Sequence, residues 1–138
     1  MSVWTHVAGV VRIDTIRCLN NVKPNFNKIF GKECLWDSKN SIWDDMNKKP
    51  SDYMPCGSEG SLRKIIWDNP NKNHASAYTV TIFGDLRDYE DTEYIVRWFK
   101  NCLKKCEEYN CWIRQATITV RTEGLESVTW TWKDKDVT

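Results

Sequence analysis

Two short glycine-containing segments carry the residue types of catalytic and anion-binding sites. The first is Gly57-Ser58-Glu59-Gly60-Ser61, whose amides and hydroxyls could hold a phosphate. It lacks the Lys-Ser/Thr pair of a P-loop and the Gly-x-Ser-x-Gly pattern of a nucleophile elbow. A plain turn is therefore the first interpretation, and an anion-binding loop is the alternative.

The second segment is Gly84-Asp85-Leu86-Arg87-Asp88, which we expect to form, together with Tyr89, a turn before a helix. Two carboxylates beside an arginine could transfer protons or hold a metal ion. Acidic residues before a helix also stabilise its N-terminus without any further role. Helix capping is the first interpretation. The alternative is a small metal-dependent hydrolase or nuclease that uses Asp85, Asp88, Glu59 or His6.

The two histidines, His6 and His74, give little support for catalysis. Neither lies near a serine or cysteine motif, as a nucleophilic triad would require. The paired H-x-T/S motifs of two-histidine phosphodiesterases are also absent. The sequence therefore predicts no catalytic residue and no cofactor, and it favours a protein that is not an enzyme.

Six cysteines, at positions 18, 34, 56, 102, 106 and 111, raise the question of disulfides or metal. The N-terminus has no export signal, so reduced thiols are expected. Cys102 and Cys106 lie four residues apart on an apolar helical stripe, where cysteine acts as a small hydrophobe. A zinc site from Cys102, Cys106, Cys111 and His74 is the alternative. Its spacing matches no standard zinc motif, so we predict no metal site.

Arginine and tryptophan together are the most informative combination. The chain has eight tryptophans, most of which we expect to pack in the core and against the sheet. Exposed tryptophans beside arginines on a sheet face can clamp a nucleotide-like ligand or form the centre of a protein interface. An ordinary solvated sheet face is the first interpretation, and the binding face is the alternative. The predicted ligand-binding residues are Arg12, Ser58, Glu59, Arg87, Arg114 and Trp130.

Length and charge limit the class of protein. The 138 residues suit one domain, residues 1–138, with a long irregular loop at about 32–61. The net charge of +1 argues against a nucleic-acid partner, because such proteins usually carry a clear basic excess. No run of 18 apolar residues exists, so no membrane span is expected, and the predicted location is the cytoplasm.

Hydrophobic periodicity predicts five strands. Residues 3–13 alternate with two largely apolar faces, as a central strand does. Residues 62–67 and 77–83 are predicted to pair across a turn. Residues 111–122 and 127–133 are predicted to form a C-terminal hairpin.

Helical signals occur in two places. Residues 14–31 read as a broken helical segment, capped by Asp14 and then by Asn25. Residues 91–108 read as a regular amphipathic helix with Asp91 as its N-cap. The predicted fold class is α+β: an antiparallel sheet with helices on one face, ferredoxin-like (split β-α-β), with an extra C-terminal hairpin strand.

Residues 4–12, 57–61 and 83–88 resemble segments of small uncharacterised proteins of phages and prophages. The resemblance implies a phage accessory protein in the host cell cytosol, and it carries no activity or catalytic residue with it. The leading interpretation is a non-enzymatic, homo-oligomeric binding protein with an anti-defence role. It would occupy a host defence protein or sequester a nucleotide-type signal. The alternative is a virion structural or accessory protein.

Overall fold

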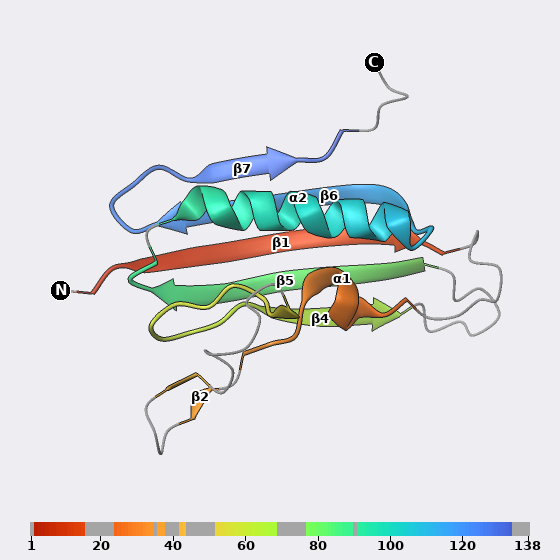
Figure 1. The fold of residues 1–138 in the computed structure, drawn as a ribbon. Coiled ribbons are helices and arrows are strands. Elements are labelled where there is room, and N and C mark those ends of the chain that lie inside the picture. Colours follow the sequence, from red (N-terminus) through yellow and green to blue (C-terminus); the bar gives the residue numbers. More distant parts are fainter. Residues whose placement is uncertain are drawn as a thin grey trace.

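The computed structural model describes residues 2–15, 24–34, 36–37, 42–43, 52–68, 77–89 and 91–133. The elements follow one another along the chain as shown in Figure 1. They are β1 (Trp4–Asp14), α1 (Phe26–Phe30), β2 (Trp36–Asp37), β3 (Ile42–Trp43), β4 (Arg63–Asp68), β5 (Ala77–Arg87), α2 (Thr92–Glu108), β6 (Trp112–Thr122) and β7 (Val128–Thr131).

The main sheet contains five antiparallel strands in the order β4-β5-β1-β6-β7. Both helices lie on one face of this sheet (Figure 1). The predicted α+β class, with an antiparallel sheet and helices on one face, is therefore confirmed. β1 pairs with β5 on one side and with β6 on the other, so the first strand is central, as its two apolar faces indicate.

The hydrophobic core lies between the sheet and the two helices. Val11, Val80 and Ile118 of the three central strands are fully buried, as are Ile95 and Phe99 of α2. The stripe predicted for residues 91–108 therefore faces the core. The predicted helix boundaries also agree with the structure, because the Asp91 side chain accepts from Tyr94 N at 2.9 Å and Asn110 leaves the helix at φ 61°.

The first predicted helical segment is only partly confirmed. Asn25 caps α1 by accepting from Lys28 N at 3.2 Å, and α1 ends at Gly31 with φ 94°. The prediction that Asp14 caps a helical turn stays a prediction, because that turn would lie in residues 16–23. Asp14 is the last residue of β1 and pairs with Ala77, because strand pairing with β5 continues through this position. Residues 16–23 lie outside the described residues.

The prediction of a turn at residues 84–89 is wrong for residues 84–87. β5 continues to Arg87, with Gly84 opposite Val7 and the fully buried Leu86 opposite Thr5. Pairing with β1 and burial of Leu86 outweigh the turn preference of glycine and aspartate. The chain turns at Asp88, whose φ is 51°.

The C-terminal hairpin of β6 and β7 is present, but one end of β6 differs from the regular alternation. Arg12 pairs with Gln115, whereas Ile13 pairs with Ile113, so Arg114 is an extra residue in the register. This irregularity turns Ile113 into the core and leaves Trp112 exposed. Regular alternation through residues 111–122 predicts that Trp112 and Arg114 share a face with Ala116, Ile118 and Val120, and the register shift makes this prediction wrong.

Candidate functional site

We call the sheet face opposite the helices the open face. In Figure 1 both described helices lie in front of the sheet, so the open face is turned away from the viewer. It is formed by alternate residues of the five strands. These are Arg63, Ile65, Trp67, Thr79, Thr81, Phe83, Asp85, His6, Ala8, Val10, Arg12, Gln115, Thr117, Thr119, Arg121, Thr129 and Thr131.

Three large apolar side chains lie exposed on neighbouring strands of the open face, and we call them the apolar patch. They are Ile65, Trp67 and Phe83, with exposed fractions of 41%, 56% and 42%. Trp67 Nε1 donates to Thr81 Oγ1 at 3.0 Å, and this bond holds the indole across β5. Exposed apolar side chains that cluster with a polar border are typical of binding surfaces.

Two arginines border the apolar patch. Arg63 is the register partner of Phe83, and Arg12 is the register partner of Thr79, which also pairs with Trp67. Neither arginine forms an ion pair with another residue in the described part of the chain. Both guanidinium groups are therefore available to an anionic ligand on the open face.

The acidic residues on this face and at its edge are already engaged. Asp85 Oδ1 lies 2.6 Å from His6 Nδ1. Asp14, at the end of β1, accepts from Arg114 Nη2 at 3.0 Å. The open face next to the apolar patch is therefore locally positive, although the whole chain has a net charge of only +1.

His6 connects two strands and a turn through both of its ring nitrogens. Nδ1 contacts Asp85, and Nε2 lies 3.2 Å from Glu123 Oε2. The hydrogen bond to Asp85, and then that to Glu123, raise the pKa of His6 above its ordinary 6.5. Donation from Trp4 N, and then from His6, holds the pKa of Glu123 below its usual value. A general base needs a free ring nitrogen that faces substrate, so this geometry favours a structural ion pair.

The raised pKa of His6 predicts a small pH dependence of stability. The contribution of His6 should be fully present below its unfolded pKa of about 6.5 and lost as the pH rises through the folded pKa. We expect the difference in unfolding free energy between the wild type and His6→Gln to shrink over that range in urea titrations. Asp85→Asn should weaken the same dependence, because it removes the main cause of the shift. A difference that grows with pH would contradict this assignment.

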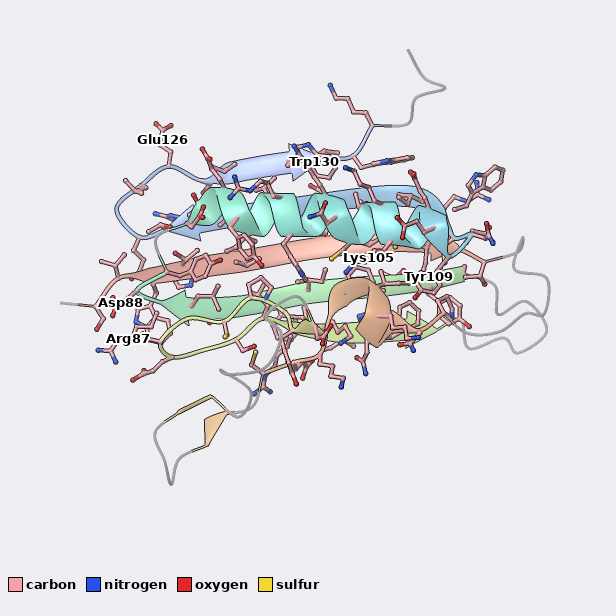
Figure 2. All side chains as sticks on the ribbon, viewed as in Figure 1. Arg87, Asp88, Lys105, Tyr109, Glu126 and Trp130 are labelled. Carbon is pink, nitrogen blue, oxygen red and sulfur yellow. The ribbon has the colours of Figure 1, made fainter. Side chains whose placement is uncertain are left out.

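Three of the six predicted ligand-binding residues meet at the end of β5. Arg87 Nη1 donates to Glu59 Oε1 at 2.6 Å, and Arg87 Nε donates to Ser2 Oγ at 2.9 Å. Ser58 Oγ donates to the main-chain oxygen of Arg87 at 3.2 Å. Figure 2 shows Arg87 next to Asp88, whose Oδ2 lies 3.6 Å from Arg87 Nε. The positive charge of Arg87 is therefore already compensated by two carboxylates.

Segment 57–61 packs against β5 as a tight loop. Gly57 N donates to Gly60 O at 3.1 Å, and Ser58 N donates to Arg87 O at 3.2 Å. A Cβ atom on Gly57 would lie 2.7 Å from Arg87 O, so the loop approaches the strand closely. Two amides that an anion-binding loop would present are thus used in backbone hydrogen bonds. This geometry favours the interpretation of the segment as a turn.

Arg114 and Trp130 lie apart from these residues. Arg114 is bonded to Asp14, and its guanidinium carbon lies 5.1 Å from the ring centroid of Trp112. Trp130, labelled on β7 in Figure 2, packs edge-on against Phe99 of α2, with ring centroids 6.0 Å apart. Trp130 is therefore on the helix-covered side, and the structure does not bring it together with Arg12.

The described residues do not form the zinc site that the sequence left open as an alternative. Within these ranges, no group of three or more His, Cys, Asp or Glu residues could hold a metal ion. Cys102 and Cys106 are buried free thiols, and burial raises the pKa of Cys102 to about 12 and that of Cys106 further. Both thiols are protonated packing residues of α2. His74, the other proposed zinc ligand, lies outside the described ranges.

None of the helices in the described part of the chain is long and apolar enough to cross a bilayer.

The sequence predictions missed Ile65, Trp67, Thr81 and Phe83. Alternation in residues 62–67 and 77–83 places these side chains on one face of each strand. The pairing of β4 with β5 then brings the two sets together. The alternation was a usable signal, but only the tertiary structure shows which face the helices cover.

Comparisons with protein-family models, with curated proteins and with solved structures found no match for this chain.

Proposed function

We propose that this protein is a non-enzymatic binding protein that binds its partner through the open face of its sheet. The observation that carries the proposal is the apolar patch, in which Trp67 is exposed yet hydrogen-bonded to Thr81. Because this bond already orders the indole, binding costs little further side-chain entropy. Tryptophan and arginine are also the residues that contribute most at binding surfaces.

The contacts of the acidic and basic side chains support a binding role over hydrolysis. Asp85 is bound to His6, while Glu59 and Asp88 face Arg87. A hydrolase or nuclease would need such carboxylates to converge on a metal ion or on a water molecule. In the described residues they form separate ion pairs instead.

We infer that the fold is of the ferredoxin-like type, and the strand order supports this. β1 and β4 flank β5, and the segment between them contains α1. β5 and β6 flank β1, and α2 connects them. This arrangement supports an interpretation as two split β-α-β units, to which β7 adds an edge strand.

For the biological setting, we propose a phage or mobile-element protein that acts against host defence in the host cytosol. The partner would be a host defence protein or a nucleotide-type signal. β7 is an edge strand with exposed Val128, which supports assembly into a homo-oligomer through this edge. A virion subunit is the alternative, and its presence in purified particles would favour that reading.

The test is native mass spectrometry of the protein purified from cells, before and after denaturation. We expect a retained mass with the wild type and its loss with Trp67→Ala. Tyr94→Ala is the matched control, because Tyr94 is an exposed aromatic residue of α2 on the other side of the molecule. A mass that Trp67→Ala retains unchanged would show that the partner binds elsewhere. An assembly that carries nothing, with pull-downs that recover no host protein, would overturn the proposal.

A further inference from the structure

We propose that the partner of the open face is single-stranded nucleic acid, with bases stacked on Trp67 and Phe83 and phosphates bound by Arg12 and Arg63. This inference rests on the proposed function, because it keeps the open face as the binding surface, but it names a different ligand from the defence protein or nucleotide-type signal proposed above. Flat aromatic rings stack on any base, and arginine binds phosphate with two parallel hydrogen bonds.

The spacing of the two rings suits neighbouring bases. Trp67 pairs with Thr79, but its hydrogen bond carries the indole towards Thr81 on the adjacent strand. Phe83 is the next residue of β5 on the same face, about 7 Å further along the strand. Two successive bases of an unstacked strand can therefore each cover one ring. In a duplex the faces of the bases are stacked on one another, so they are not accessible to the rings of Trp67 and Phe83.

The charges of the patch border favour an anionic ligand. Arg12 and Arg63 lie at different ends of the apolar patch, and neither pairs with an acidic side chain of the described residues. Arg121, opposite His6, lies further along β6, where its charge acts on the carboxylate of Glu123. The low net charge expected to exclude nucleic acid is a property of the whole chain. It does not describe this face, where acidic residues are engaged in ion pairs.

The remainder of the open face favours nucleic acid over a protein partner. Beyond the patch, the face continues as threonines, and Thr117 and Thr119 bond to Thr131 and Thr129 at 3.1 Å. Hydroxyl groups can donate to and accept from sugars and base edges.

The test is fluorescence anisotropy with labelled single-stranded DNA and RNA of about 12 nucleotides, which covers the usual site size. We expect Trp67→Ala and Phe83→Ala each to weaken binding roughly 5- to 100-fold. Thr81→Val keeps the side-chain shape but removes the bond to Trp67, so it should weaken binding by about 2- to 10-fold. Tyr94→Ala, on α2, should leave the affinity unchanged.

Salt titrations test the phosphate contacts separately. Each of Arg12→Gln and Arg63→Gln should reduce the slope of log K against log salt by about 0.7, as expected for one lost phosphate contact to a single strand. Arg97→Gln is the charge control, because Arg97 is exposed on α2 and faces Asp91. Circular dichroism of every variant checks that the variant is folded, so that weaker binding is not caused by unfolding.

Three outcomes would overturn the inference. One is equal binding of a DNA hairpin and of a single strand, with no effect of Trp67→Ala, which would indicate unspecific charge attraction. Another is binding of a mononucleotide as tight as that of the oligonucleotides. The third is no oligonucleotide binding, while a protein partner is retained in native mass spectra only when Trp67 is present. In that last case the proposed function stands and the nucleic-acid inference fails.

Discussion

Replacing Phe99 with alanine should lower the free energy of unfolding by about 3–5 kcal/mol. Phe99 is fully buried in α2 and contacts Trp130 edge-on, with ring centroids 6.0 Å apart. Its removal leaves a cavity between the helix and the sheet, and packed cores close such cavities only in part. A domain of this size is stable by about 5–15 kcal/mol, so the loss is a large share of the total.

Urea denaturation measures this loss, and Tyr94→Ala provides the matched control. Tyr94 is an exposed aromatic residue of the same helix, so its truncation should change stability by about 0.5 kcal/mol or less. Because Trp130 lies on β7, Phe99→Ala should also speed amide exchange in this edge strand. A loss below about 1 kcal/mol would mean that α2 packs on the sheet differently.

The best-predicted element, α2, was predictable because its signals are local. The apolar stripe repeats at helical spacing, and Asp91 and Asn110 mark the two ends within the same stretch of sequence. The central position of β1 was also predictable, since both of its faces are largely apolar. Together these signals were enough for the α+β class with helices on one face of an antiparallel sheet.

The incorrect predictions concern positions where a distant strand decides the conformation. Gly84-Asp85 carries turn residues, yet pairing with Val7 and His6 of β1 keeps both extended. In the sequence, Arg114 fits the regular alternation of β6. In the structure, the register between β6 and β1 shifts next to Arg12, and Arg114 becomes the extra residue. The turn or strand propensity of a segment depends on its own residues only, so it contains no information about these partners on other strands.

The sequence predicted the kinds of residue in the candidate site better than it predicted where those residues lie. Ser58, Glu59 and Arg87 do meet, but their charges and hydrogen bonds are directed at one another. Arg12 lies on the open face beside a patch that the sequence did not single out. Whether an arginine is free or paired depends on register across the sheet, and a sequence shows the arginine without its neighbours.

Replacing Gly60 with alanine should lower the free energy of unfolding by about 3 kcal/mol or more. Gly60 has a φ of +79°, where a non-glycine residue is strained by about 1–2 kcal/mol. A Cβ atom at this position would also overlap the main-chain oxygen of Asp85, and backbone cannot move aside as a flexible side chain can. The loop 57–61 would therefore have to leave β5.

Gly124→Ala is the matched control, because it separates strain from overlap. Gly124 has a φ of +85° in the turn after β6, and a Cβ there meets nothing within 4 Å. Gly124→Ala should lower the free energy of unfolding only by the backbone strain, which is about 1–2 kcal/mol. The excess loss in Gly60→Ala then measures the packing of the loop on Asp85. Because the Asp85 carboxylate binds His6, the displaced loop should also lower the pKa of His6 in an NMR titration. Equal losses in the two variants, with an unchanged pKa of His6, would show that the loop does not hold this end of β5 in place.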